Sequence, residues 1–200
     1  MTAPIYRLGT FALVAVVAGA TCGRPEAARA AEPYGTWLTE DGRARVRTER
    51  CGSDASRLCG FIVWMKEPSD KDGRPKVDQY SPNTAWQSRP QMGHQMLLGL
   101  KPDAEGRFEG KIYNAENGKS YDVTVWSDQP SALTVKGCML VFCASQSWKR
   151  VVDLVPGQLQ GSTDGQGGPV SDPDWMSSGA RAGTPSAKKL PSGGVVTHSR

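Results

Sequence analysis

The chain has 200 residues, of which 38% are hydrophobic and 22% are charged, and its formal net charge is +4. This length suits one domain with a single core and is too short for a large multidomain enzyme. The small positive charge is spread along the chain without a basic stripe, so the composition does not indicate a nucleic-acid-binding protein.

The N-terminal segment, residues 1–30, has the pattern of a secretory signal peptide. Arg7 precedes the apolar run Leu8–Ala20, which is too short to span a bilayer comfortably, and Ala28-Arg29-Ala30 provides a small-x-small cleavage signal. We therefore expect a mature chain that starts at residue 31 and has no transmembrane segment. Two alternatives are an uncleaved anchor and lipidation of Cys22, although the leucine of a lipobox is missing.

From residue 31 onward, short apolar or alternating runs are separated by turn signals, and no run keeps a helical period. The run 58–65 is apolar on both parities, so we expect both of its faces to be covered. The sequence predicts strands at Tyr34–Leu38, Arg43–Glu49, Leu58–Met65, Met96–Leu100, Arg107–Tyr113, Lys119–Trp126, Ala132–Lys136, Met139–Phe142 and Ser145–Val151.

The longest interruption between strands is Lys66–His94, which contains prolines 68, 75, 82 and 90. Loops of this length in compact domains are often functional, and its aromatic residues Tyr80 and Trp86 must pack on something. We expect a flap over one mouth of the fold. Asp70-Lys71-Asp72-Gly73 lacks the ligand spacing of a calcium loop, and His94 is expected to be a solvated loop residue.

A tight hairpin is expected at Asn114–Gly118, between the runs Arg107–Tyr113 and Lys119–Trp126. Asn117-Gly118 supplies the positive-φ positions that such a reversal needs. Phe108 and Ile112 should then share one face with Tyr121 and Val123.

Eight or nine short strands with tight connections predict an all-β fold, an antiparallel meander over residues 31–155. Because a flat sheet of this size leaves open edges, closure into an up-and-down barrel of about eight strands is favoured. A β-sandwich is the alternative.

The segment 156–200 is dominated by Gly, Ser, Pro, Asp and Gln and has no apolar period. We expect a disordered tail there, because too few large side chains offset the ordering entropy. Trp175-Met176 is the one part that could dock.

Five cysteines are present, and Cys22 would leave with the signal peptide. The remaining four allow three pairings, of which the local one, Cys51 with Cys59 and Cys138 with Cys143, fits best. The alternative is a four-cysteine zinc site, whose usual ligand spacing is tighter. Disulfides place the mature protein in an oxidising compartment, and we expect it to be periplasmic or secreted.

Ordered motifs along the chain resemble a known family. Trp37 in Gly35-Thr36-Trp37 on the first strand and Arg150 on the last are similar to the lipocalin and calycin pattern, in which an arginine packs over the indole and closes the barrel. The complete set of motifs resembles the domain of unknown function 2147 family over about residues 34–151; it comprises Gly35-Thr36-Trp37, Leu58-Cys59-Gly60 after Cys51, Gly73–Asp78, Arg89–Gly93, Gly110–Tyr121, Leu133–Gly137 and Ser145–Arg150.

This resemblance implies an exported bacterial protein with a lipocalin-like β-barrel and transfers no catalytic residue. The chain departs from the family pattern at Ser81-Pro82-Asn83, at Gln87-Ser88-Arg89-Pro90 and at Tyr113-Asn114-Ala115, where the family has Tyr-Asp-Pro. The long C-terminal tail is also outside the usual domain.

The leading functional hypothesis is that the barrel interior binds a small hydrophobic or amphipathic molecule. The alternative is a barrel filled by its own side chains, which acts as a protein–protein or cell-envelope interaction module. The candidate ligand-binding residues are Ile62, Trp64, Tyr80, Trp86, Met96, Leu98, Phe108, Ile112, Tyr121, Val123 and Leu133.

The sequence does not indicate a familiar enzyme, and we predict no catalytic residue, cofactor or metal. It has two histidines and lacks the common nucleophile, zinc-protease and phosphate-loop motifs. Glu116 and Asp122 could act as an acid–base pair but are expected to be merely exposed. A third hypothesis, an unrecognised enzyme, would be built around Tyr113, Asp78 and Arg89.

Overall fold

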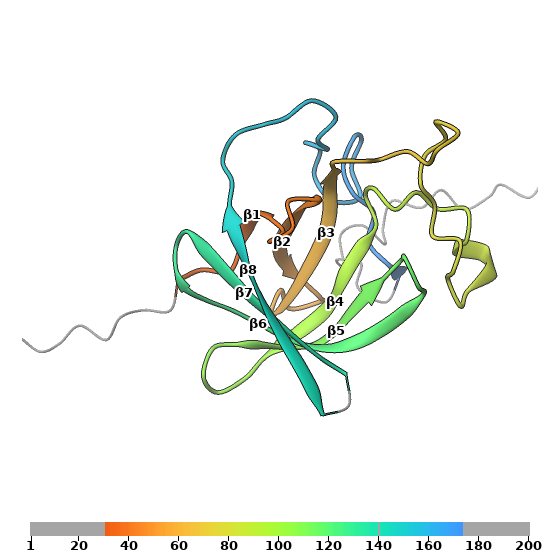
Figure 1. Cartoon of the computed structure of the whole chain (residues 1–200). Helices are drawn as coiled ribbons and strands as arrows, with labels where there is room; N and C mark the ends of the chain where they lie inside the picture. The colour runs from red at the N-terminus through yellow and green to blue at the C-terminus, as the bar shows by residue number, and fades with distance from the viewer. Residues whose placement is uncertain (1–30, 140, 174–200) are drawn as a thin grey trace, which may run out of the picture.

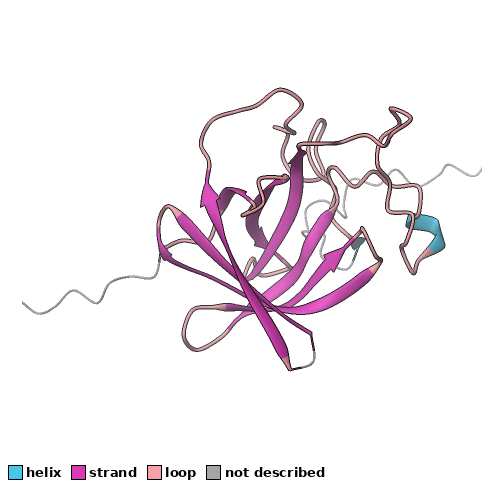
Figure 2. Cartoon of the chain, viewed as in Figure 1, coloured by secondary structure: helices cyan, strands magenta, loops and turns pink. Residues whose placement is uncertain are grey.

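The computed structural model describes residues 31–139 and 141–173, shown as coloured ribbon in Figure 1. The predicted signal peptide, Cys22 and Trp175-Met176 lie outside the described residues. A single short 3-10 helix, η1 (Thr84–Trp86), interrupts the long loop (Figure 2). The strands of the described residues are β1 (Gly35–Leu38), β2 (Ala44–Cys51), β3 (Arg57–Met65), β4 (Gln95–Pro102), β5 (Phe108–Asn114), β6 (Lys119–Gln129), β7 (Ala132–Met139) and β8 (Phe142–Arg150).

The eight strands form a closed barrel in which each strand pairs with its neighbours in sequence, all antiparallel. Closure comes from β1 and β8, where Trp37 lies opposite Arg150 and Leu38 opposite Lys149. The predicted up-and-down barrel is therefore confirmed, and the β-sandwich alternative is wrong.

One predicted strand is wrong. Met139–Phe142 was expected to be a strand of its own, whereas β7 ends at Met139 and β8 begins at Phe142. Cys138 lies opposite Cys143 in the β7–β8 ladder, and the two are bonded as a disulfide. The apolar run thus crosses a hairpin reversal, which the period-2 pattern alone did not distinguish from a strand.

The β5–β6 hairpin follows the prediction in its strand pairing, but of the two expected positive-φ positions only Gly118 has a positive φ, and Asn117 does not. Phe108 lies opposite Val125, and Ile112 lies opposite Tyr121, so these side chains share one face. Gly118 has φ +69°, and a Cβ there would come within 1.9 Å of the carbonyl oxygen of Tyr80. Glycine is thus required both by the turn and by the approach of the long loop.

The main core fills the barrel interior. Two glycines make room for it, because a Cβ on Gly60 would lie 2.6 Å from Leu97 Cδ1, and one on Gly110 would lie 2.7 Å from Leu100 Cδ2. The buried members of this core are Trp37, Val46, Leu58, Leu97, Leu100, Phe108, Val123, Val125, Leu133, Val135 and Trp148.

One end of the barrel, here called the closed end, is sealed around Trp37. The Arg150 guanidinium lies 4.1 Å from the centre of the Trp37 ring, which is the contact that the sequence indicated. Arg150 also donates to the Tyr34 and Glu32 carbonyl oxygens, so it ties the N-terminal residues across this end. The Trp37 indole donates to Thr48 Oγ1 at 2.8 Å.

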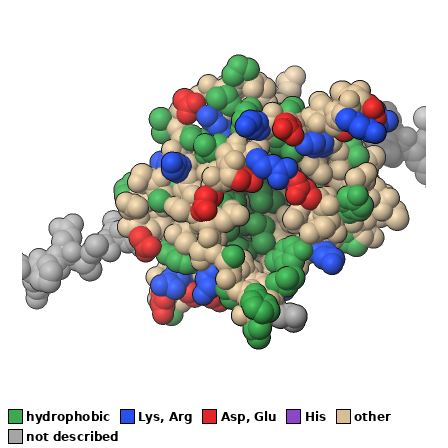
Figure 3. Space-filling view, in the orientation of Figure 1, with side chains coloured by type: hydrophobic (Ala, Val, Ile, Leu, Met, Phe, Trp, Pro, Cys, Tyr) green, Lys and Arg blue, Asp and Glu red, His purple; other side chains and the backbone are tan. Residues whose placement is uncertain are grey.

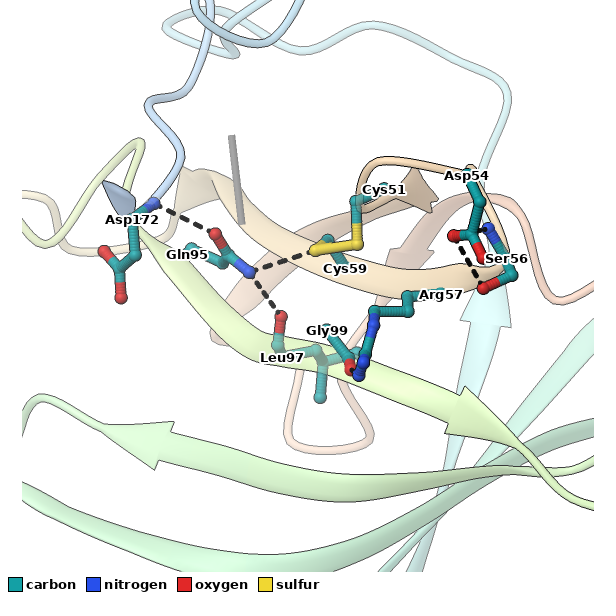
Figure 4. Close-up of a disulfide and its surroundings, with 9 residues drawn as sticks. All are labelled: Cys51, Asp54, Ser56, Arg57, Cys59, Gln95, Leu97, Gly99 and Asp172. Atoms are coloured by element: carbon teal, nitrogen blue, oxygen red, sulfur yellow. Dashed lines mark hydrogen bonds between the residues drawn. A yellow bond between two sulfur atoms is a disulfide. The ribbon is translucent and has the colours of Figure 1, made fainter. Parts of the chain in front are cut away.

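The outer face of β3 is also covered, as its two-sided apolar pattern predicted. Cys51 and Cys59 form the second predicted disulfide and make a small buried cluster with Phe61. Figure 4 shows Gln95 beside this disulfide, where its amide donates to Cys59 Sγ and to the Leu97 carbonyl. Its side-chain oxygen accepts from the Asp172 backbone N–H, a residue far along the chain.

Residues 151–173, here called the C-terminal strap, provide much of that cover and can be followed as the cyan-to-blue trace after β8 in Figure 1. Arg45 donates to the Asp153 carbonyl and to Gln158, and Arg47 donates to the Gly161 carbonyl and to Thr163. The Leu159 N–H donates to the Val63 carbonyl.

The expected start of the disordered tail, residue 156, is therefore corrected: residues 156–173 follow a defined path along the barrel. The physical reason is that hydrogen bonds, rather than a run of apolar side chains, hold this segment against the barrel. The backbone carbonyls of Asp153 and Gly161 accept hydrogen bonds from Arg45 and Arg47, and tight turns replace a hydrophobic period. The remainder of the expected tail, 174–200, lies outside the described residues.

Candidate functional site

The opposite end of the barrel holds a cavity of about 380 Å³, here called the mouth cavity. Its volume falls in the range of sites that hold small molecules. At the β1–β2 turn it is bordered by Thr39, Asp41, Arg43 and Ala44, and at the β5–β6 turn by Asn114, Ala115 and Glu116. Six side chains from five strands make its inner wall: Ile62, Met96, Ile112, Tyr121, Gln146 and Trp148.

The rim of the mouth cavity is charged and self-neutralising. Arg43 pairs with Glu116 at 3.0 Å, and Lys76 lies 3.8 Å from Glu67. Arg43 and Glu116 are 59% and 62% exposed, so their pairing contributes little to stability and is open to rearrangement. An apolar interior beneath a polar rim suits an amphipathic guest.

His94 lies at the inner edge of this cavity and is only 4% exposed. The expectation of a solvated loop histidine is wrong, because residue 94 is fixed by backbone bonds on two sides. Its carbonyl accepts from the Ile62 N–H at 3.1 Å, and it forms a parallel bridge with Val170 of the strap. Burial, together with the charge of Arg89, lowers the pKa of His94 to about 3, so the imidazole is neutral at physiological pH.

A buried polar network stands next to His94. Tyr113, whose ring centre is 5.8 Å from that of His94, donates from its hydroxyl to Asp78 Oδ1 at 2.6 Å. Asp78 is fully buried, and its other oxygen accepts from Arg89 at 3.0 Å. Arg89 also pairs with Asp172 of the strap at 2.7 Å and stacks 4.6 Å from the Trp86 ring centre.

This network brings together Tyr113, Asp78 and Arg89, the residues of the enzymatic hypothesis, and the three side chains are bonded to one another. Burial and the bond to Asp78 raise the pKa of Tyr113 to about 12, so the phenol keeps its proton. Both oxygens of Asp78 are occupied by Tyr113 and Arg89. The cluster fastens the long loop and the strap to β5. Glu116 and Asp122 are exposed, as expected, and they pair with Arg43 and Lys111.

Four of the candidate ligand-binding residues line the mouth cavity: Ile62, Met96, Ile112 and Tyr121. Phe108, Val123 and Leu133 belong to the packed core instead. The Trp64 ring centre lies 5.8 Å from the Arg45 guanidinium, and neither Trp64 nor Leu98 is among the cavity residues.

The two aromatic residues of the expected flap do not line the cavity. Tyr80 is 56% exposed, and Trp86 packs against Arg89. Other parts of the loop do border the mouth, namely Lys66, Glu67, Lys76 and Gln91. The loop therefore shapes the rim through its charged residues rather than through its aromatic ones.

The candidate ligand-binding residues left out most of the residues that border the cavity, among them His94, Gln146 and Trp148. The signal for the last two was available, since Gln146 and Trp148 have the same parity on β8 and lie opposite Val135 and Leu133 of the inward face of β7. His94 carried no such signal, because it lies outside the strands and is held by residues distant in the sequence, among them Tyr113 and Val170.

Among residues 31–139 and 141–173, no group of three or more His, Cys, Asp or Glu side chains is arranged to hold a metal ion. Within the same part of the chain, none of the helices has the length and apolar character needed to cross a membrane.

The fold and its cavity define a small antiparallel β-barrel that is packed at one end and hollow at the other. The chain belongs to the family described as "Uncharacterized protein conserved in bacteria (DUF2147)", whose model matches residues 35–150. This confirms the family resemblance that the ordered motifs indicated. A search of curated proteins finds no match.

Among solved structures, the chain is similar to protein HP1028 from the human pathogen Helicobacter pylori, described as belonging to the lipocalin family. The two are 23% identical, with a TM-score of 0.49, over 62% of this chain and 85% of that one.

Proposed function

We propose that this protein is an exported binding protein that holds a small hydrophobic or amphipathic molecule in the mouth cavity. The observation that carries this proposal is the hollow of about 380 Å³ between an apolar inner wall and a charged rim. Pockets with these features are the default sites for small ligands. The lack of an available nucleophile or base in the adjacent network favours binding over catalysis.

Two features support export to the periplasm or the cell exterior. The disulfides Cys51–Cys59 and Cys138–Cys143 are both formed, and such bonds persist in oxidising compartments. The expected signal peptide over residues 1–30 agrees with this location.

A matched pair of tryptophan substitutions tests the binding proposal. Ala44 lines the mouth cavity, whereas Ala104 lies in the exposed β4–β5 turn outside it. Ala44→Trp should fill the cavity and abolish the fluorescence enhancement of N-phenyl-1-naphthylamine, a neutral apolar probe. Ala104→Trp should leave saturable binding unchanged. Equal binding by both variants, or none by the wild type, would refute ligand binding in this cavity.

A second candidate function is favoured by one surface feature. At the β7–β8 hairpin, Met139, Val141 and Phe142 are 59%, 87% and 75% exposed, and the Cys138–Cys143 disulfide clamps their base. Hydrophobic side chains gather at the lowest point of Figure 3, where Figure 1 places this hairpin. Contiguous exposed apolar side chains mark interaction sites, so this tip supports the alternative of a cell-envelope or protein-binding module.

The two functions are separable by substitution. Val141→Ser with Phe142→Ser should leave probe binding in the cavity intact. If the tip mediates envelope interaction, a photoreactive residue at position 139 should form crosslinks in cells when Val141 and Phe142 are intact, and the double variant should lose them. Identical crosslinking in both backgrounds would count against a role for the tip.

A further inference from the structure

The imidazole of His94 is a buried polar group whose two nitrogens have no hydrogen-bond partner among the described residues. The residue is 4% exposed and lines the mouth cavity. Leaving a buried donor or acceptor unsatisfied costs about 1–3 kcal/mol. Buried polar side chains are normally paired, so an orphan at the wall of a cavity calls for a ligand group.

The neighbours of His94 cannot fill this role, because they are engaged with one another. The Tyr113 hydroxyl donates to Asp78 at 2.6 Å. Arg89 is shared between Asp78 and Asp172 at 3.0 and 2.7 Å. The side chain of Gln95, the next residue along the chain, already has partners in Cys59, Leu97 and the Asp172 backbone.

Charge around the imidazole narrows the chemistry of the missing group. The nearby cation, Arg89, is paired with two carboxylates, Asp78 and Asp172, so it is already engaged and is not a free counter-charge for an acidic head group. The cavity's charged lining is also balanced, with Asp41, Glu67 and Glu116 against Arg43, Lys66 and Lys76. Burying a charged head group here would meet a desolvation cost without a counter-charge.

We propose that His94 is the polar anchor of the mouth cavity and selects ligands with an uncharged hydrogen-bonding head group, such as a hydroxyl, ester or amide, on an apolar chain. This inference rests on the proposed function, since it names the ligand class of the same cavity. A neutral imidazole presents one N–H donor and one acceptor nitrogen, so it can serve either a hydroxyl or a carbonyl oxygen. The apolar chain would then lie along Ile62, Met96 and Ile112.

The test compares three probes of equal chain length that displace N-phenyl-1-naphthylamine at pH 7.5: 1-decanol, decanoate and decylammonium. The wild type should bind 1-decanol at least about tenfold more tightly than either ion, which corresponds to about 1.4 kcal/mol. His94→Leu should weaken 1-decanol binding by about threefold to tenfold, the loss of one neutral hydrogen bond. It should leave the affinity for the two ions nearly unchanged.

Two further variants control for packing. Met96→Leu alters the apolar wall and should shift all three probes in parallel. His94→Gln keeps a donor and an acceptor and should retain the preference for 1-decanol, which a purely structural role of His94 would not produce. Thermal melts of each variant show that it is folded, and His94→Gln carries the test if His94→Leu does not fold.

The outcomes distinguish this inference from the proposed function. If neither the fluorophore nor any decyl probe binds the wild type, the cavity is not a binding site and both ideas fall. If the affinities for the three probes agree within about threefold, or if His94→Leu weakens all three equally, the cavity is still a binding site but the anchor role of His94 is refuted. Tighter binding of decanoate would likewise overturn the selection for an uncharged group.

Discussion

The two ends of this barrel are built from the same strands but differ in packing: one end is closed and the other holds a cavity. At the closed end, Trp37 is fully buried, its indole N–H bonds to Thr48, and Arg150 covers its ring. At the mouth end, Trp148 is nearly as buried, yet it borders a cavity of about 380 Å³ together with an unpartnered His94. The buried indole of Trp37 is hydrogen-bonded at the closed end, whereas the mouth end keeps empty space and an imidazole without a hydrogen-bond partner.

This difference indicates that the closed end contributes most of the stability and that the mouth end contributes the proposed binding function. The closed end and the disulfide-backed face of β3 hold the strands together, and this allows the mouth to stay hollow. Substitutions at the closed end should therefore unfold the protein, while substitutions at the mouth should change binding with little loss of stability.

The largest effect is expected from Trp37→Ala, which removes a fully buried indole and its contact with Arg150. We expect a loss of about 4 kcal/mol in the free energy of unfolding, measured by urea denaturation. The matched variant Met96→Ala at the mouth should cost about 1 kcal/mol, because its side chain already faces a hollow. Equal losses would remove the distinction between the ends.

The second prediction concerns the network beside the mouth. Arg89→Met leaves the fully buried Asp78 with Tyr113 as its remaining side-chain partner and should cost about 3 kcal/mol. Arg43→Met, which breaks the exposed pair with Glu116, should cost under about 1 kcal/mol. Urea denaturation of both variants measures the contrast, and a small effect at Arg89 would show that the network does not fasten the loop.

The third prediction compares the two disulfides. Cys51→Ala with Cys59→Ala should cost about 2.5 kcal/mol from the released loop alone, plus lost packing, since Cys59 is fully buried. Cys138→Ala with Cys143→Ala, at the exposed hairpin, should cost about 2 kcal/mol. Denaturation without reductant tests the order, which would be reversed if the hairpin disulfide held the barrel closed.

The last prediction is a pH dependence of the free energy of unfolding, which His94 at the mouth cavity should cause. An unfolded histidine titrates near 6.5, whereas the folded pKa of His94 is about 3, lowered by burial and then by Arg89. The stabilisation by neutral His94 is complete above pH 6.5 and is lost as the pH falls toward 3. At pH 5 the wild type should have lost about 2 kcal/mol more than His94→Leu. Parallel stability curves for the two proteins would contradict this.

Much of the barrel was predictable from local patterns. Alternation in the runs that became β5 and β6, together with Asn117-Gly118, defined a hairpin whose register the structure confirms. The two-sided apolar run of β3 predicted a covered outer face. The cysteine pairing followed because each pair closes a short loop between neighbouring strands.

The mouth was harder to predict, because its features depend on residues distant in the sequence. The alternation of a strand indicates which side chains point inward but not how deep they lie. The predicted ligand contacts therefore include Phe108 and Leu133, which instead fill the core. The strap was missed because its contacts are arginine-to-carbonyl bonds, which leave no hydrophobic pattern. His94 was misplaced for the same reason, since the strap helps to bury it.

The most direct test uses two indole protons as reporters of the two ends. The Trp148 Nε1–H donates to Gln146 Oε1 at the mouth cavity, and the Trp37 Nε1–H donates to Thr48 Oγ1 at the closed end. In a titration with 1-decanol followed by ¹H–¹⁵N correlation spectra, the Trp148 indole signal should shift saturably while that of Trp37 stays in place. Saturable movement of the Trp37 signal alone, or no movement of the Trp148 signal, would contradict a hollow, ligand-binding mouth above a packed closed end.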